Sequence, residues 1–458
     1  MLSSLAFLLP PLRIIAANAW PVLVAQLASM AMMVIDTALL GHYGAADLAA
    51  VAVGGGIYIA VVMAAIGVLQ AVAPVVAHLH GAGREAELAG ALQQAFWLAL
   101  FLAVPACLLM RFPGPLLALT SMEPVVEAKT RDYLGILAWG LPFVLIYRSF
   151  HAFSNALGQP RPLMVISLLA TSLHLPLSWA LIFGHLGSRP LGVAGSGYST
   201  LAVSLLGFAC ALGYLLLSPV LRPLRLLTHW QRPRWRSQAE LLRLGLPMGF
   251  SNLVEISAFT FIALFVAGLG ATVVAGHRII ANLSALAYML PLSVAIATLA
   301  QVGRHAGAQD WLGARAAVAA GMLLAGGLSS LAALGLWFGA GMLVPAYSSD
   351  PEVVAVALSL IGYLAAYQLF DAIQTIAGFA LRACKVTLVP MVIHTLCFWG
   401  VGLGIGWWLA FGTPAMGAAG YWLAATLSLV PAAALLSGLL WWVLRGLAAE
   451  GDSGRVPR

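Results

Sequence analysis

The chain has 458 residues, of which 62% are hydrophobic and only 8% are charged. Soluble globular domains carry about 25% charged residues, so this composition excludes an ordinary soluble protein and indicates a chain that crosses a membrane many times. A net charge of +7 is compatible with a nucleic-acid partner, but the basic residues follow the pattern of a membrane protein instead.

Twelve apolar stretches along the chain are long enough to span a bilayer as helices. In chain order they cover residues 14–40, 48–77, 88–110, 133–156, 162–184, 193–220, 243–268, 273–302, 314–343, 353–380, 388–411 and 417–444. The first stretch is too long for a signal peptide and lacks a small-residue cleavage site, so we expect it to remain as a helix. We therefore predict an all-α polytopic membrane protein.

The Lys and Arg residues predict the orientation of these helices. If the N-terminus is cytoplasmic and the helices alternate, all but five of the 22 Lys and Arg fall on the cytoplasmic side. The five exceptions are Arg111, Lys129, Arg131, Arg189 and Arg278. This positive-inside pattern predicts that both termini are cytoplasmic. It also makes the basic segment 221–240 a cytoplasmic linker near anionic lipid rather than a nucleic-acid site.

The sequence also matches itself at a nearly constant shift. Examples are Pro21 with Pro247 and Met63 with Met289 at a shift of 226, Phe143 with Phe370 at 227, and Gly192 and Gly195 with Gly417 and Gly420 at 225. Each copy holds six helices, so both copies enter the membrane from the same side. We predict two parallel six-helix lobes, residues 1–220 and 241–445, around a central cleft suited to alternating access, with a cytoplasmic tail at 446–458.

Three of the fifteen acidic residues lie within apolar stretches: Asp36, Glu255 and Asp371. An ionised Asp at the centre of a bilayer costs roughly 2.5–3.5 kcal/mol, so an acid in this position is a functional hypothesis by default. Such an acid, when it shares its site with a cation, can exchange a proton or Na⁺ near neutral pH.

Asp371 lies on a polar stripe of its predicted helix. The positions three and four residues away hold Tyr367, Gln368, Gln374 and Thr375, and the other faces are apolar. This stripe is expected to face a cavity or a partner helix rather than lipid. Oxygen atoms here suit a hard cation such as Na⁺, and Gln368 and Gln374 are candidates for the substrate cleft. The alternative is a structural hydrogen-bond stripe between helices.

Glu255 has Ser251 and Asn252 on the same helical face, four and three residues before it. Pro247 and Gly249 weaken the helix upstream and could expose carbonyls as further ligands. Glu255 is in the same lobe as Asp371, so the two carboxylates could converge. The alternative is that each is satisfied separately by backbone and water.

Asp36 belongs to the other lobe, and the repeat-related position is Ile262, so the two copies differ in chemistry. Candidate partners for Asp36 are His174, Ser178 and Thr200, although a lone histidine in an apolar helix is usually a satisfied core residue.

Three methionines, Met30, Met32 and Met33, precede Asp36. Their soft side chains suit varied aromatic ligands, with Met33 a candidate for the substrate cleft, or they fill a core. The chain lacks a G-x-x-x-x-G-K-[ST] phosphate loop and the H-E-x-x-H and G-x-S-x-G motifs, so we expect neither an ATPase of that kind nor an enzyme.

Several stretches together resemble the MATE (multidrug and toxic compound extrusion) transporters, in particular their NorM-type bacterial branch. These stretches are "MVIDTALLGHYGAADLAAVAVG" (Met33–Gly54), "QAVAPVVAHLHGAGR" (Gln70–Arg84), "LLRLGLPMGFSNLVEISAF" (Leu241–Phe259), "VVAGHRIIANL" (Val273–Leu283), "QVGRHAGAQD" (Gln301–Asp310) and "FDAIQTIAGFALRACK" (Phe370–Lys385). The resemblance covers nearly the whole chain.

The resemblance implies an antiporter of the bacterial inner membrane that expels cationic, amphipathic drugs and dyes in exchange for Na⁺ or H⁺. It implies that Glu255, Tyr367 and Asp371 form the C-lobe cation site and that Asp36 is the N-lobe acid of coupling and drug release. We expect a monomer with no cofactor, no nucleic-acid partner and no metal beyond Na⁺ at Glu255 and Asp371.

The chain departs from the family at three positions. The family often has Asn where this chain has His174, Asn or Asp where it has Ser178, and Gln where it has Arg278. We hypothesise that His174 is a titratable partner of Asp36 and shifts coupling toward protons.

Three other functions compete with this interpretation. A lipid-linked precursor flippase of the same superfamily would favour a cationic cleft, whereas the intramembrane charges here are chiefly acidic. A membrane enzyme would need a catalytic constellation, and a passive channel would be expected to have a continuous polar lining.

Overall fold

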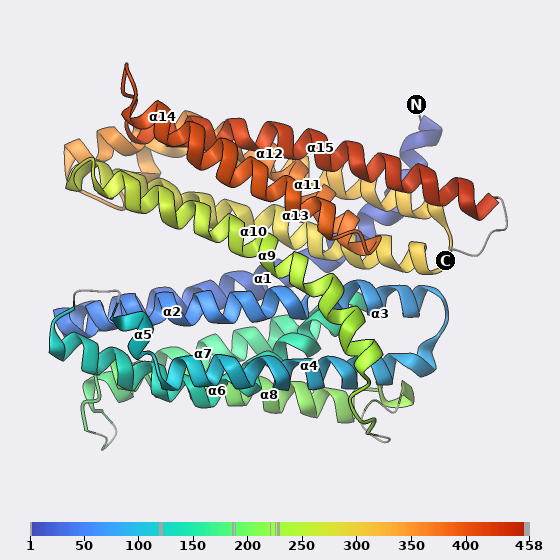
Figure 1. Ribbon diagram of the computed structural model, residues 1–458, viewed down its shortest axis with the longest axis horizontal. Coiled ribbons are helices and arrows are strands. Elements are labelled where there is room, and N and C mark those ends of the chain that lie inside the picture. The colour runs from blue at the N-terminus through green and yellow to red at the C-terminus, as the bar shows by residue number, and fades with distance from the viewer. Residues whose placement is uncertain are drawn as a thin grey trace. The chain divides into compact units, whose positions relative to one another are not determined.

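The computed structural model describes residues 2–118, 122–185, 187, 189–219, 221–224, 226 and 230–452, and every regular element in these ranges is a helix (Figure 1). Twelve helical segments are long and apolar enough to cross a membrane. The predicted all-α fold with twelve membrane-spanning helices is confirmed. Residues 225 and 227–229 of the predicted linker and 453–458 of the predicted tail lie outside the described residues.

The described part of the chain up to residue 267 contains nine α-helices and one short 3₁₀ turn. The elements are α1 (Leu2–Tyr43), α2 (Ala45–Leu69), α3 (Val72–Gly81), α4 (Glu85–Arg111), α5 (Gly114–Leu117), α6 (Pro124–Ala156), α7 (Arg161–Phe183), α8 (Val193–Leu217), η1 (Arg222–Leu224) and α9 (Trp235–Ala267). The predicted span 48–77 is therefore interrupted, because the regular helix breaks between α2 and α3.

The second half continues with α10 (Ala271–Gly307), α11 (Trp311–Leu343), α12 (Pro351–Ala383), α13 (Leu388–Thr395), the π-helical segment η2 (Leu396–Ile405), α14 (Gly406–Phe411) and α15 (Ala418–Asp452). Most helices extend beyond the predicted apolar stretches, since a helix continues after its hydrophobic part ends. α15 runs into the predicted tail, as far as Asp452.

The chain forms two compact units. The N-unit comprises Val24–Leu79 and Arg84–Gly249, and the C-unit comprises Met1–Leu23, His80–Gly83 and Phe250–Arg458. Two of the boundaries fall before residues 24 and 250, and 250 − 24 = 226 is the shift of the internal repeat. The first helix of each repeat, α1 or α9, therefore divides between units at an equivalent point. The predicted lobe limits and the central cleft remain predictions.

Repeat-related glycines have matching backbone conformations. Gly192 and Gly417 each precede a helix and have φ of 55° and 58°, a left-handed conformation that glycine adopts without steric cost. Three residues later, a Cβ on Gly195 would lie 2.7 Å from the Leu181 carbonyl carbon, and a Cβ on Gly420 would lie 2.8 Å from that of Leu409. Equivalent helix pairs, α7 with α8 and α14 with α15, thus pack backbone to backbone.

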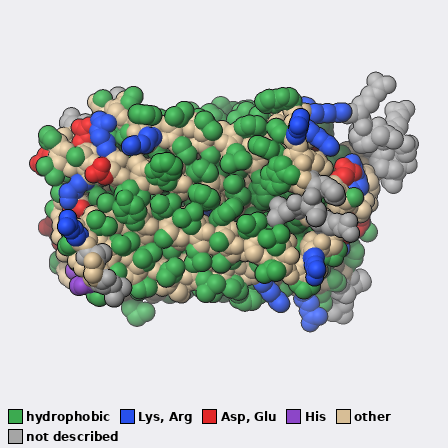
Figure 2. Space-filling model, turned by 90° about the horizontal axis from the view of Figure 1, so that it is seen from below, with side chains coloured by type: hydrophobic (Ala, Val, Ile, Leu, Met, Phe, Trp, Pro, Cys, Tyr) green, Lys and Arg blue, Asp and Glu red, His purple; other side chains and the backbone are tan. Residues whose placement is uncertain are grey.

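Many large hydrophobic side chains are exposed, as expected for helices that face lipid. Figure 2 shows hydrophobic side chains over most of the visible face, with Lys, Arg, Asp and Glu gathered toward its two ends. Large exposed side chains include Phe338, Leu217, Met342 and Trp139. Helices that are hydrophobic all round fit a bilayer, because their backbone polar groups are satisfied within each helix.

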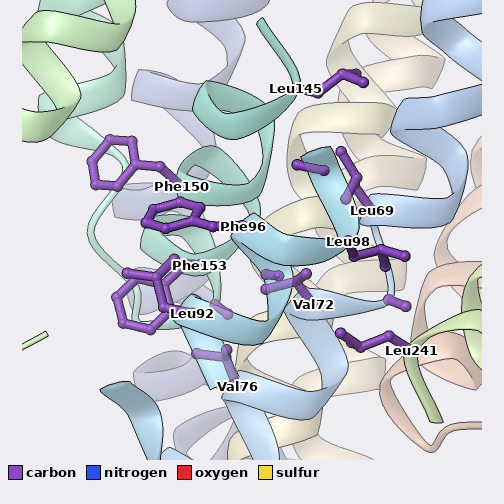
Figure 3. Close-up of a cluster of buried hydrophobic side chains, with 14 of the residues drawn as sticks. Leu69, Val72, Val76, Leu92, Phe96, Leu98, Leu145, Phe150, Phe153 and Leu241 are labelled. Atoms are coloured by element: carbon purple, nitrogen blue, oxygen red, sulfur yellow. The ribbon is translucent and has the colours of Figure 1, made fainter. Parts of the chain in front are cut away.

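A hydrophobic cluster forms the core of the N-unit. Phe96, Phe150 and Phe153 lie next to one another and to Leu92, and Leu241 of α9 lies in the same cluster (Figure 3). All these side chains except Leu241 and Phe96 are at most 1% exposed. The cluster fixes α4 and α6, which lie in the unit that contains Asp36.

Two adjacent glutamines of α4 hold the linker to the N-unit. The Gln94 side chain donates from Nε2 to the Arg232 carbonyl (2.9 Å) and accepts at Oε1 from the Arg234 backbone N–H (2.8 Å). The Gln93 side chain donates from Nε2 to the Leu226 carbonyl (2.9 Å) and accepts at Oε1 from the Gln231 backbone N–H (2.8 Å). Each glutamine amide thus pairs with one carbonyl and one N–H of the linker backbone.

Candidate functional site

In the N-unit, Asp36 of α1 is 8% exposed and belongs to a hydrogen-bonded group on α7 and α8. Its Oδ1 lies 3.0 Å from Nε2 of His174 and accepts from the Ser178 hydroxyl at 3.2 Å. His174 and Ser178 are four residues apart, so they share one face of α7. The structure therefore brings these three predicted residues together.

The group continues onto α8 through Ser199 rather than through Thr200. The hydroxyls of Ser178 and Ser199 are 2.6 Å apart, and Ser199 donates to the Ser196 carbonyl at 2.9 Å. Gly195 makes this contact feasible, since it lets α8 approach the backbone of α7. One residue further along a helix turns the side chain by about 100°.

Two other predicted residues lie apart from this hydrogen-bonded group. Thr200 is half-buried, and its carbonyl accepts from the Ser204 hydroxyl at 2.7 Å. Met33 is 50% exposed. Neither residue is a hydrogen-bond partner of Asp36 in the described part of the chain.

His174 is 1% exposed, and its Nδ1 has no hydrogen-bond partner among the described residues. If Nε2 donates to the Asp36 carboxylate, Nδ1 is a bare acceptor. A buried acceptor without a partner costs about 1–3 kcal/mol. The Nδ1 side of the ring is therefore open to a further polar partner.

A second buried acid of the N-unit, Asp47 in the first turn of α2, is 4% exposed. It pairs with Lys129 of α6 and accepts at Oδ1 from the Val193 backbone N–H, at the start of α8, at 2.9 Å. A carboxylate at a helix N-terminus is stabilised by the unpaired N–H groups there. Asp47 therefore ties α2, α6 and α8 together, and its spacing in the sequence gives no sign of this.

In the C-unit, Asp371 of α12 is 1% exposed. Its Oδ1 accepts from Nε2 of Gln374 at 2.9 Å, and the same nitrogen donates to the Thr375 hydroxyl at 3.1 Å. The other end of the Gln374 amide, Oε1, lies 3.1 Å from Nε2 of His394 in α13. The predicted polar stripe of α12 is thus a buried hydrogen-bonded group, extended by a histidine that sequence reasoning did not select.

Glu255 of α9 is half-buried and interacts electrostatically with both Asp371 and Arg382. Arg382 was placed by sequence on the cytoplasmic side, yet it is only 7% exposed. Its Nη2 donates to the Asn252 amide oxygen at 3.1 Å. Three ionisable groups thus share one apolar region, where Arg382 reduces the cost of an ionised Glu255.

Tyr367 and Gln368 are buried next to this group. The Tyr367 ring packs edge-on against Phe259 and Trp422, with centroids 6.0 and 6.1 Å apart. Gln368 donates to the Ser284 hydroxyl at 3.5 Å, and its Oε1 has no partner among the described residues. A buried carbonyl oxygen without a donor is available to a cation or a polar ligand.

The two hydrogen-bonded groups offer mainly oxygen atoms as ligands. Carboxylate, amide and hydroxyl oxygens predominate, and the described part of the chain holds no group of three or more His, Cys, Asp or Glu arranged to bind a metal ion. Such oxygens suit Na⁺ better than a transition metal.

Comparison with known proteins agrees with the fold. The MatE family model matches residues 21–180 and 247–408, and these segments begin at the repeat-related Pro21 and Pro247. The chain is 54% identical over 432 residues to the probable multidrug resistance protein NorM of Aromatoleum aromaticum, with 93% of each chain covered. It is 34% identical over 432 residues to multidrug resistance protein NorM of Aliivibrio fischeri, again with 93% of each covered.

A solved structure shows the same fold at low sequence identity. The Vibrio cholerae MATE transporter VcmN in the bent form superposes with a TM-score of 0.84 at 20% identity, covering 96% of this chain and 99% of that one. Fold and site together define a multi-pass α-helical membrane protein with buried carboxylates in each of two units. The chain belongs to the MatE family.

Proposed function

We propose that the protein exports small cationic, amphipathic drugs and dyes in exchange for Na⁺ or H⁺. The observation that carries this proposal is the burial of carboxylates within membrane-spanning helices of both units, Asp36 at 8% and Asp371 at 1% exposure. Relatives named as multidrug resistance proteins support it. Acids in apolar surroundings attract cations and are costly to leave ionised and empty.

The driving force follows from charge transfer. Moving one elementary charge across a membrane potential yields about 2.3 kcal/mol per 100 mV. At about 1.4 kcal/mol per tenfold, this sustains roughly a 50-fold gradient of substrate. Glu255, Tyr367 and Asp371 form the C-unit cation site in this proposal, and Asp36 is the acid that couples ion entry to drug release in the N-unit. Alternating access by the two lobes exposes these acids to one side at a time.

His174 sets the ion preference in this proposal. Its hydrogen bond to Asp36 and its unpartnered Nδ1 favour a proton as the ion handled by the N-unit. The variant His174→Asn keeps a donor but cannot titrate. We expect it to change the pH profile or the Na⁺ dependence of export, and the role of His174 fails if neither changes.

The surroundings of the protein are part of the same proposal. We place it as a monomer in the bacterial inner membrane with both termini cytoplasmic, acting as a transporter rather than an enzyme and without a cofactor or nucleic-acid partner. Basic residues of the linker, such as Arg232, Arg234 and Arg236, are exposed and suit contact with anionic lipid.

Ethidium uptake into inverted vesicles tests the proposal, since this direction corresponds to export from the cell. Vesicles are loaded with Na⁺ or with acid, and uptake is compared for the intact protein and for Asp36→Asn, Glu255→Gln and Asp371→Asn. We expect gradient-driven uptake by the intact protein and its loss in each variant. An intact protein that moves no dye under either gradient refutes the proposal.

A further inference from the structure

Gln374 connects the acid Asp371 to a second titratable residue, His394, through one amide. All three side chains are buried, with exposures of 1%, 3% and 6% for Asp371, Gln374 and His394. Water is therefore a poor substitute for any of these contacts, and each orientation of the amide must be satisfied by its neighbours.

The amide has a defined orientation. Nε2 of Gln374 donates to Asp371 at 2.9 Å, so Oε1 is the atom that faces Nε2 of His394 at 3.1 Å. An amide oxygen only accepts, so His394 is the donor. In this state the Gln374 NH₂ group faces the Asp371 carboxyl group, and a donor in that position opposes a cation on that side.

Reversing the amide by half a turn exchanges its two ends. The carbonyl oxygen then faces Asp371 and supplies the kind of ligand that Na⁺ prefers. The NH₂ group then faces His394 and needs an acceptor there. While His394 keeps its proton on Nε2, reversal places the NH₂ group of Gln374 against the Nε2–H of His394, and two donors face each other. A shift of that proton to Nδ1, or withdrawal of the ring, removes the conflict.

The position of His394 offers a way to withdraw the ring. His394 lies in the last turn of α13, and the ten-residue π-helical segment η2 starts two residues later at Leu396. π-Helical turns are rare and concentrate at functional positions. A rearrangement of α13 and η2 would move the imidazole relative to α12 and so change the orientation that Gln374 prefers.

We propose that Gln374 is a reversible amide that switches Asp371 between an empty state and a Na⁺-holding state, and that His394 is the positioning residue that selects between them. This inference rests on the proposed function, because it assigns Asp371 to the coupling ion. It adds a device by which helix movement and ion occupancy are linked inside one unit.

The test uses the purified full-length protein and needs no drug. Its apparent melting temperature is measured against NaCl concentration, with choline chloride holding ionic strength constant. Three variants are compared with the intact protein: His394→Phe, which removes the donor, His394→Gln, which retains one, and Gln374→Met, which removes the amide. The readout is the Na⁺ concentration that gives half of the full stabilisation. A merely structural role would lower the melting temperature but leave this concentration unchanged.

We expect His394→Phe to lower the half-maximal Na⁺ concentration about fivefold, the equivalent of the roughly 1 kcal/mol of one hydrogen bond. His394→Gln should stay close to the intact protein. In the Gln374→Met background, His394→Phe should have no further effect on Na⁺, since the two residues act through the same amide.

Three results would overturn the inference. The first is an unchanged half-maximal Na⁺ concentration in His394→Phe, and the second is that His394→Phe changes this concentration equally in the Gln374→Met background. The third is that Na⁺ does not stabilise the intact protein. If His394→Phe does not fold, His394→Met replaces it, because its side chain also lacks an N–H donor. This variant should bind Na⁺ more tightly than the intact protein, and an unchanged half-maximal Na⁺ concentration would overturn the inference. Failure of dye export with the Na⁺ effect intact would refute the proposed function alone.

Discussion

The linker contact of Gln94 gives a prediction with a magnitude. Gln94→Leu removes three hydrogen bonds: to the Arg232 carbonyl, from the Arg234 N–H, and from Nε2 of Gln238 at 3.0 Å. At about 1 kcal/mol each, with some replacement by water, the linker loses about 2–3 kcal/mol of attachment. At about 1.4 kcal/mol per tenfold, the detached form becomes roughly 30- to 150-fold more populated.

Limited trypsinolysis measures this population, because cleavage follows the fraction of chain that is locally open. Trypsin can cut after Arg234 and Arg236, and the Arg232–Pro233 bond resists it. We expect cleavage at these two sites to accelerate by about the same factor. Ser204→Ala is the control, since it removes one hydrogen bond within its own helix. Equal cleavage rates in folded Gln94→Leu and intact protein would refute the reasoning.

Two further predictions concern stability, each checked by thermal unfolding. Lys129→Met leaves the buried Asp47 carboxylate without its ion-pair partner and should cost about 1–3 kcal/mol of folding stability, less than a fully buried pair because Lys129 is 35% exposed. Adding Asp47→Asn should restore part of this loss, and an additive loss in the double variant would contradict the assignment. Asp310 caps α11 outside the membrane, and its pKa is lowered first by the backbone N–H of Gly313 and then by the neighbouring His305. The cap therefore contributes its full stability above about pH 4, and this contribution decreases as the pH falls further. Asp310→Ala should therefore cost about 1 kcal/mol at pH 7 and less at pH 3, and a cost that grows on acidification would contradict the assignment.

The fold could be predicted from sequence because its main signal is local. A stretch of about 20 apolar residues specifies a spanning helix almost regardless of its neighbours. The repeat was visible for a similar reason: left-handed and closely packed positions such as Gly192 and Gly195 admit little but glycine. The break between α2 and α3 gave no such signal, since apolar residues flank it on both sides.

The site was predictable only in part. Hydropathy revealed the buried acids, and helical spacing revealed neighbours on the same helix, such as Gln374 beside Asp371. Partners on other helices depend on how each helix is rotated, which is a tertiary property. Ser199 rather than Thr200 reaches Ser178 for this reason. The burial of Arg382 was hidden as well, since its position near the end of α12 resembles that of a cytoplasmic anchor.

The central claim is that the buried acids exchange a small cation for a larger one. Its most direct test combines Asp36→Asn, Glu255→Gln and Asp371→Asn in one protein and measures ethidium uptake into inverted vesicles under the gradient that drives the intact protein. Glu352→Gln, an exposed acid of α12, serves as the matched control. We expect uptake to disappear in the folded triple variant and to persist in the control. Uptake at the intact rate by the triple variant would contradict the account.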